Sequence, residues 1–191
     1  QMYHAIKGEV EKRAMLYLPK GEKTSTSWYD PLGRMYECVT SKYKSSALGQ
    51  FFTPKNVVDM MTQMTIGSVE QTGRVIHMLD PTSGSGRMGL AAATHAMLQG
   101  QPTWITMNDL DPICTKMTTA NMCLNGIVGE ALCSDGLDTT GDTYKFGYRV
   151  EPMIAQVPEA MQSVYRMAML AKTGQDIQKL YVAKPVDYER T

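Results

Sequence analysis

The sequence has little of what membrane proteins, zinc proteins and strong DNA binders contain. No apolar run approaches the roughly 20 residues that a membrane-spanning helix needs. The four cysteines form no C-x-x-C pair and only three histidines accompany them, which argues against a structural zinc site. Nineteen Lys and Arg balance nineteen Asp and Glu, so the chain lacks the basic excess of a protein that grips DNA alone. We therefore expect a soluble cytoplasmic protein with reduced thiols and no metal.

The composition is that of an ordinary globular domain. Hydrophobic residues make up 43% of the chain and charged residues 20%, which fits one domain with a full core and at most a small appendage. Residues 1–48 are expected to form an N-terminal helix and a polar loop, and residues 49–191 an α/β domain. Apolar residues recur every four positions over Tyr3–Leu18, which predicts the helix. Residues 20–49 are polar and predict a loop with at most a short ordered turn.

A glycine-rich turn is the centre of the sequence. Residues 79–86 (LDPTSGSG) follow an apolar run and precede helix-like residues from Arg87, which predicts a buried strand, a turn and a helix. Gly84 and Gly86 can take positive φ and carry no Cβ, so a ligand can approach bare backbone at a helix start. Asp80 would stand at the carboxyl end of the strand, where it would repel a pyrophosphate but suit an ammonium group. This favours S-adenosylmethionine over a dinucleotide, with an ordinary strand-to-helix turn as the alternative.

Residues 49–54 (GQFFTP) form a second informative stretch. Thr53 is a good N-cap and Pro54 a good first helical residue, so a helix should begin there. Its buried side would consist of Val57, Val58, Met60, Met61 and Met64. Helix capping needs only the Thr-Pro pair, and it leaves the preceding Gly-Gln-Phe-Phe without an explanation.

A second strand and helix follow the glycine turn. Thr103–Met107 predicts a buried strand, and Asp111-Pro112 is an N-cap and first-turn pair that opens a helix closed by Asn125-Gly126. Asp109 therefore stands at the end of the second strand, where a carboxylate can accept hydrogen bonds from both ribose hydroxyls of a nucleoside.

Two motifs together carry a family resemblance. Residues 49–61 (GQFFTPKNVVDMM) and 79–90 (LDPTSGSGRMGL) resemble the start of the N6-adenine DNA methyltransferases, most closely the modification subunit of type I restriction systems. The resemblance covers roughly residues 47–138. It implies an α/β fold, a truncated Rossmann-like S-adenosylmethionine-dependent methyltransferase domain with a short helical N-terminal lead. In that family the first motif lies over the methionine end of the cofactor, and the Asp-Pro turn holds the cofactor from below.

The resemblance also implies a set of cofactor-binding residues. In the family the ribose-binding acid lies three residues before the helix proline, which is the position of Asp109. In the family an acid after strand three recognises the adenine amine, and Asp135 is at the matching position. The alternative is an ordinary turn, in which an acid often precedes a glycine. Leu110, with Ile113, would pack either on the adenine ring or in the core. The implied set is Phe52, Thr53, Pro54, Asp80, Ser83, Gly84, Gly86, Asp109, Leu110 and Asp135.

The catalytic motif of that family is absent from the sequence. Adenine-N6 methyltransferases carry Asn or Asp, then Pro-Pro, then Tyr or Phe after strand four, to hold the target amine and stack on the flipped base. This sequence has no Pro-Pro and no asparagine after Asn125. If residues 144–150 form strand four, its exit holds Glu151 and Pro152, which are weak catalytic candidates because Met153 beside them offers no flat stacking surface.

Three functional hypotheses follow. The favoured one is an S-adenosylmethionine-binding relative that does not methylate alone, such as a partner, regulatory or phage-type protein. The alternatives are an active methyltransferase with a divergent or partner-completed catalytic motif, and an enzyme that acts on S-adenosylmethionine itself. DNA or a protein that completes the site would be its partner, self-association is left open, and the resemblance implies a bacterial, archaeal or phage-infected cell. Too few residues follow strand four, we expect, for a seven-stranded sheet and a target-recognition domain.

Overall fold

The computed structural model describes residues 28–39, 52–67, 74–138, 140–152, 162 and 181–188. The helix predicted over residues 3–18 lies outside these ranges. The elements are, in chain order, α2 (Pro31–Val39), α4 (Lys55–Ile66), β1 (Ile76–Asp80), α5 (Arg87–Leu98), β2 (Thr103–Asp109), α6 (Pro112–Asn125), β3 (Gly129–Cys133), β4 (Phe146–Pro152) and β5 (Tyr181–Val186).

The five strands form one mixed sheet in the order β1-β2-β3-β4-β5. β1 pairs with β2 and β2 with β3 in parallel, with Asp80 opposite Met107 and Asp109 opposite Cys133. The carboxyl ends of these three strands therefore lie along the same edge of the sheet. β4 runs antiparallel to β3, and β5 antiparallel to β4.

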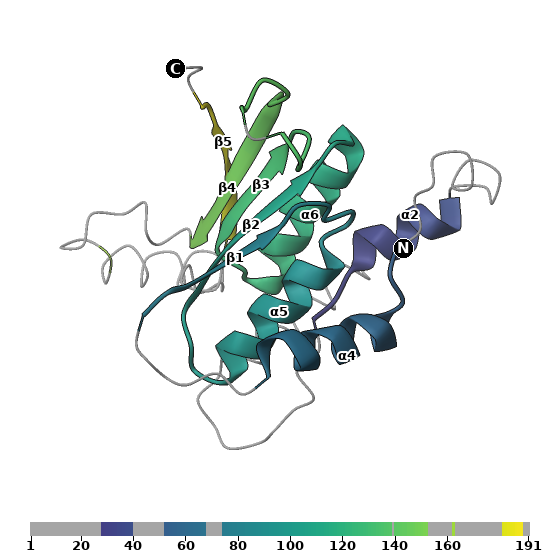
Figure 1. The fold of residues 1–191 in the computed structure, drawn as a ribbon, viewed down its shortest axis with the longest axis vertical. Coiled ribbons are helices and arrows are strands. Elements are labelled where there is room, and N and C mark those ends of the chain that lie inside the picture. The colour runs from purple at the N-terminus through teal and green to yellow at the C-terminus, as the bar shows by residue number, and fades with distance from the viewer. Residues whose placement is uncertain are drawn as a thin grey trace.

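The described helices cover one face of this sheet, as Figure 1 shows. α5 packs on β1 and β2, α6 packs on β2 to β5, α4 lies against α5, and α2 lies against α6. Strand residues facing the helices, such as Ile105, Met107 and Val150, are almost fully buried and form the core with Leu90 and Met122. Parallel strands joined by helices are the α/β unit that the sequence predicted, so that prediction is confirmed for β1 to β3. None of the described helices is long and apolar enough to cross a membrane.

Local signals set the bounds of the two helices that follow parallel strands. The N–H of Ile113 donates to Oδ1 of Asp111 at 2.8 Å, and Pro112 is the first residue of α6. Gly126 ends this helix in the left-handed conformation, with φ of 66°. α5 begins at Arg87, directly after the glycine turn. α6 therefore begins and ends where the capping pattern predicted, and α5 begins where the glycine turn predicted.

The start and the buried side of α4 differ from the prediction. The helix begins at Lys55, Pro54 is extended with ψ of 145°, and no side chain caps the first turn, so Thr53 is not the N-cap. Only Val58 and Thr62 of α4 are buried. Three methionines predicted to be buried are 54%, 43% and 78% exposed: Met60, Met61 and Met64. α4 packs mainly against α5, so a single narrow stripe of the helix meets the core.

Residues 28–33 pack against the core and lead into a helix, where the sequence predicted a polar loop. Pro31–Val39 forms α2, and Trp28 is 6% exposed and belongs to the hydrophobic core cluster. The side chain of Asn125 accepts the N–H of Tyr29 at 2.9 Å and donates to its carbonyl at 2.7 Å. The loop prediction is therefore wrong for this stretch. The division at residue 48 stays a prediction, although Trp28 shares one core with the α/β domain.

β1 is less buried than predicted. Among the residues that the structure describes, it pairs with β2 alone, and Leu79 on its far side is 70% exposed.

The cysteines are all free thiols. No group of His, Cys, Asp and Glu within the described ranges could hold a metal ion.

Candidate cofactor site

Asp80 and Asp109 end two adjacent parallel strands, and the glycine turn lies beside them. Oδ2 of Asp109 accepts the N–H of Gly84 at 2.7 Å, and its Oδ1 accepts the N–H of Asp111 at 2.8 Å. Backbone donors therefore fix this carboxylate against the turn. Each of its oxygens still has a second lone pair that can accept a hydrogen bond from a ligand hydroxyl.

Asp80 carries a buried oxygen without a partner. Its Oδ1 accepts the N–H of Thr82 at 3.3 Å, whereas Oδ2 has no hydrogen-bond partner among the described residues. Burial raises the pKa of Asp80; the backbone amides of Thr82 and Gly89 oppose the rise, and the charge of Asp109 adds to it. A buried acceptor left unpaired costs free energy. Oδ2 itself faces the protein interior, and the carboxylate brings a negative charge to the end of β1 that suits a ligand with an ammonium group.

The two glycines of the turn face different surroundings. Both have positive φ, 58° for Gly84 and 93° for Gly86. A Cβ at Gly84 would lie 3.1 Å from the ring of Phe52. A Cβ at Gly86 would instead lie 3.3 Å from Met107 and Thr118 in the core. Gly86 therefore allows α5 to pack closely on the sheet, whereas Gly84 lies on the side of Phe52. That both glycines admit a ligand stays a prediction.

The rest of the turn is held rigidly and keeps a second unpaired polar atom. The N–H of Ser83 donates to the carbonyl of Asn108 at 2.8 Å, and Oγ1 of Thr118 donates to the carbonyl of Gly84 at 2.9 Å. Oγ of Ser83 is buried and has no hydrogen-bond partner among the described residues. Ser83 therefore adds a free hydroxyl to the free carboxylate oxygen of Asp80.

The first motif lies next to the second in space. The half-buried ring of Phe52 lies 5.7 Å from the ring of Tyr36, and the guanidinium of Arg87 lies 5.2 Å from its centroid. The carbonyl of Thr53 accepts a hydrogen bond from Nη1 of Arg87 at 3.1 Å. Pro54 is exposed. The fold therefore brings together two motifs that the sequence separates by a helix and a strand.

Asp135 and its loop approach the same edge of the sheet. Asp135 follows β3 by two residues, and its Oδ1 accepts the N–H of Leu137 at 3.0 Å in a local turn. A Cβ at Gly136 would lie only 2.1 Å from the carbonyl oxygen of Pro81, so this loop touches the strand-to-turn junction directly. Asp135 is thus near the turn, with one oxygen already used by its own loop.

Leu110 and Ile113 lie outside the core. Leu110 is 58% exposed and Ile113 is 53% exposed, just beyond Asp109 at the carboxyl edge. The core alternative for these two side chains is therefore wrong. They offer an apolar surface beside the carboxylate that could contact a flat ring.

Most of the described residues match the model of a known protein family. Residues 27–158 match the family model described as N-6 DNA methylase. This chain belongs to the N-6 DNA methylase family. The match begins immediately before Trp28, so it includes the stretch around α2 that packs in the core.

Among solved structures, this member of the N-6 DNA methylase family is similar to the methyltransferase subunit of a type I restriction-modification system from Streptococcus thermophilus. The two are 28% identical with a TM-score of 0.36, and the match covers 41% of this chain and 16% of that subunit. No curated protein matches the sequence.

Glu151 and Pro152 lie away from the site in this member of the N-6 DNA methylase family. They belong to β4, which is antiparallel to β3, and Val150 before them pairs with Gly129 at the start of β3. They therefore lie at the edge opposite to Asp109. Oε1 of Glu151 also pairs with Nζ of Lys184 at 2.6 Å. The expectation that strand four ends beside the cofactor motifs is wrong, because the strand runs in the other direction.

Asp30 is the polar residue that sequence reasoning missed. Its side chain is 2% exposed. Its carboxylate accepts hydrogen bonds, at 2.6 to 2.7 Å, from the N–H of Gly33, Oγ of Ser85, Nε of Arg87 and Nδ2 of Asn121. One signal was available: Asp30-Pro31 is the same N-cap and first-turn pair as Asp111-Pro112, and it too opens a helix.

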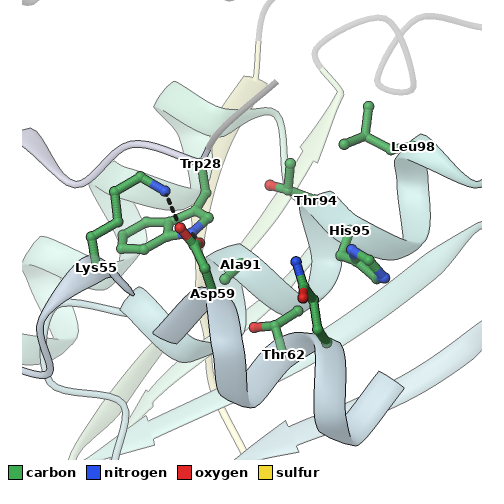
Figure 2. A pocket seen from close by; sticks show the side chains of 9 residues that line it. Trp28, Lys55, Asp59, Thr62, Ala91, Thr94, His95 and Leu98 are labelled. Carbon is green, nitrogen blue, oxygen red and sulfur yellow. Dashed lines mark hydrogen bonds and ion pairs between the residues drawn. The ribbon is translucent and has the colours of Figure 1, made fainter. Parts of the chain in front are cut away.

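A separate pocket of about 220 Å³ lies between α4 and α5, away from the glycine turn. Figure 2 shows Trp28 and Lys55 at one end and His95 at the other. Asp59 accepts from Nε1 of Trp28 and from Nζ of Lys55, both at 2.6 Å. Thr62 also lines this pocket, and its buried Oγ1 has no hydrogen-bond partner among the described residues. None of the implied cofactor-binding residues lines this pocket, although Lys55 and Asp59 belong to the first motif.

Proposed function

We propose that this chain binds S-adenosylmethionine at the sheet edge formed by the ends of β1 and β2. The main support is the acid pair that flanks Gly84. The carboxylate of Asp80 supplies a negative charge that suits the ammonium group of the ligand, and Asp109, fixed by two backbone amides, keeps lone pairs for the ribose hydroxyls. N6-adenine DNA methyltransferases use S-adenosylmethionine as methyl donor, and the family assignment supports the same ligand here.

The neighbouring side chains fit the remaining parts of that ligand. Phe52 would cover the turn above Gly84, with Thr53 and Pro54 completing that wall. Leu110 would contact the adenine ring, and Asp135 would accept from its exocyclic amine. When bound, the cofactor supplies an electrophilic methyl group. The chain's own residues would bind and orient it.

We further propose that the isolated chain does not methylate adenine in duplex DNA. Extruding a base costs a few kcal/mol, and stacking on an aromatic side chain returns roughly 1 to 3 kcal/mol. The sequence has no Asn-Pro-Pro-aromatic motif to supply that stacking. Glu151 could accept a hydrogen bond from the target amine in place of the missing asparagine, but it lies at the opposite edge of the sheet in an ion pair with Lys184. The chain would then act as a partner, regulatory or phage-type protein.

One observation favours a second candidate, a methyltransferase whose catalytic motif comes from another chain. Within the described ranges, β1 pairs only with β2, so the strand that ends at Asp80 is open along its outer side. A strand from a partner could pair there by main-chain hydrogen bonds. It would bring its carboxyl end next to Asp80.

A thermal unfolding series tests the binding proposal. At about 100 times the Kd, a ligand stabilises the native state by about 2.7 kcal/mol, which raises the Tm of a chain of this size by roughly 5 to 10 °C. S-adenosylmethionine and S-adenosylhomocysteine are expected to raise the Tm. ATP is the matched control and is expected to leave it unchanged, because Asp80 repels its phosphates. Stabilisation by ATP as strong as that by S-adenosylmethionine would contradict the assignment.

A methyl-transfer assay separates the two candidate functions. Tritiated S-adenosylmethionine is incubated with mixed-sequence duplex DNA and the purified chain. No label in adenine is expected. Label that appears with this chain alone and is lost in Glu151→Ala would reject the inactive reading, and label that appears only after a second protein is added would favour the partner-completed enzyme.

A further inference from the structure

Arg87 joins three segments that are distant in the sequence. It is the first residue of α5 and is 8% exposed. Its Nε donates to Oδ2 of Asp30 at 2.7 Å, and Nη2 donates to Oε2 of Glu37 at 2.9 Å. Nη1 also donates to the carbonyl of Thr53, and the guanidinium lies against the ring of Phe52. One planar cation therefore fixes the first motif relative to the start of α5.

Asp30 holds the other side of the same arrangement. Its Oδ2 accepts from Oγ of Ser85 at 2.6 Å as well as from Arg87. Ser85 stands between the two glycines of the turn, so the carboxylate fixes the turn from behind. Asn121 of α6 donates to Oδ1 at 2.6 Å and holds the carboxylate in place. Both motifs are thus anchored to one buried ion pair.

The position of Phe52 depends on these anchors and decides what lies above Gly84. The ring atoms lie 3.1 and 3.2 Å from the place where a Gly84 Cβ would stand. Gly84 belongs to the turn that follows Asp80, whose negative charge suits an ammonium group. The acceptors proposed for the nucleoside, Asp109 and Asp135, lie at the ends of β2 and β3 instead. A displaced Phe52 would therefore alter the amino-acid end of the site more than the nucleoside end.

We propose that Asp30 and Arg87 are positioning residues that hold Phe52 and Thr53 over the glycine turn, and thereby set the preference for ligands that carry an amino-acid group. The inference rests on the proposed S-adenosylmethionine site. Arg87 meets Glu37, Asp30 and Thr53 through a rigid fork of donors, and lysine cannot reproduce that geometry although it keeps the charge.

The experiment compares two ligands in the full chain by calorimetry: S-adenosylmethionine, and 5′-methylthioadenosine, which has the nucleoside and sulfur but no amino-acid group. In Arg87→Lys, the affinity for S-adenosylmethionine is expected to fall about tenfold, and that for 5′-methylthioadenosine by less than about twofold. Asp59→Asn is the matched control. It removes a carboxylate that pairs with Lys55 and Trp28, and none of these three belongs to the implied cofactor-binding set. It is expected to leave the ratio of the affinity for S-adenosylmethionine to that for 5′-methylthioadenosine unchanged.

A second pair of variants keeps the inference testable if Arg87→Lys does not fold. Glu37 is 45% exposed, so Glu37→Gln should fold, and it is expected to shift the affinity ratio in the same direction by a smaller factor. Phe52→Leu alone should lower the ratio of the affinity for S-adenosylmethionine to that for 5′-methylthioadenosine. Adding Glu37→Gln to Phe52→Leu should then have little further effect, because the arginine acts through the ring.

Each result decides the inference. A lowered ratio in Arg87→Lys or Glu37→Gln, absent from Asp59→Asn, supports positioning. Equal losses for both ligands would show a merely structural pair and overturn it, as would unchanged affinities. A wild-type chain that binds 5′-methylthioadenosine but not S-adenosylmethionine also overturns it, whereas one that binds neither ligand rejects the proposed function itself.

Discussion

Replacing Asp109 by asparagine changes one atom and tests the centre of the proposed site. The carboxylate accepts the N–H of Gly84 with one oxygen and the N–H of Asp111 with the other. Asparagine has only one acceptor oxygen, so its NH₂ group must face one of these two N–H groups. The variant therefore loses at least one hydrogen bond that holds the turn, along with the negative charge that would face the ribose.

The expected loss of affinity follows from the bonds at stake. A hydrogen bond to a charged group contributes about 1.5 to 3 kcal/mol, and two ribose hydroxyls would donate to Asp109. Water and the remaining amide oxygen offset part of this, which leaves about 3 kcal/mol, or roughly a hundredfold in Kd. S-adenosylmethionine and S-adenosylhomocysteine share the ribose, so both affinities should fall by the same factor.

Calorimetry of wild type and Asp109→Asn with both ligands measures this loss. Circular dichroism on the same samples shows whether the variant remains folded. A folded Asp109→Asn chain that keeps wild-type affinity would refute the role of Asp109 in ribose binding. A loss confined to S-adenosylmethionine would place Asp109 at the methyl-bearing end of the ligand instead.

Three further predictions follow from the geometry of the turn and the α4–α5 pocket. Gly84→Ala is expected to weaken S-adenosylmethionine binding through its contact with the Phe52 ring, whereas Gly86→Ala should mainly lower the free energy of unfolding, by about 1 to 3 kcal/mol; calorimetry and urea unfolding that gave equal effects would speak against this division. Thr62→Val removes a buried unpaired hydroxyl and should leave stability unchanged or raise it by up to about 1 kcal/mol in urea unfolding, and a clear loss would mean that Oγ1 has a partner. Burial raises the pKa of Asp80, so the native state binds its proton more tightly than the unfolded state, and the ligand-free chain should lose stability as pH rises from the unfolded-state pKa through the raised one. Asp80→Asn should remove that part of the pH dependence of Tm, and an unchanged profile would exclude Asp80 as its source.

The parts of the fold that could be predicted from the sequence are specified by residues adjacent in the chain to the element that they begin or end. Asp111 and Pro112 are adjacent to the helix that they open, and Gly126 is adjacent to the helix that it ends. The glycine turn likewise follows its strand directly. Such signals specify where an element begins and ends without reference to the rest of the chain.

The role of Asp30 could not be predicted in this way, because its partners are distant. Ser85, Arg87 and Asn121 lie 55, 57 and 91 positions further along the chain. The polar residues that precede Trp28 predict a loop, and nothing in the sequence near Asp30-Pro31 indicates that this carboxylate is buried. A helix-opening pair was present, and its burial depended on tertiary contacts alone.

The direction of β4 and the exposure of the α4 methionines could not be predicted from the sequence for related reasons. A strand sequence such as Phe146–Pro152 does not indicate whether the strand is parallel or antiparallel to its neighbour, yet the direction decides which edge of the sheet Glu151 occupies. The methionines of α4 look like a core face in the sequence, but only one stripe of the helix, around Val58 and Thr62, meets its neighbours. The number of packing partners is not encoded in the periodicity of a single helix.

Isothermal titration of S-adenosylmethionine into the wild-type chain tests the central claim most directly. The acid pair of Asp80 and Asp109, with one carboxylate oxygen unpaired and the other carboxylate fixed on Gly84, predicts saturable binding at one site per chain. The affinity should exceed that for adenosine, because the ammonium group adds a charged contact with Asp80. Heats no larger than those of dilution, in a chain shown to be folded, would contradict the claim.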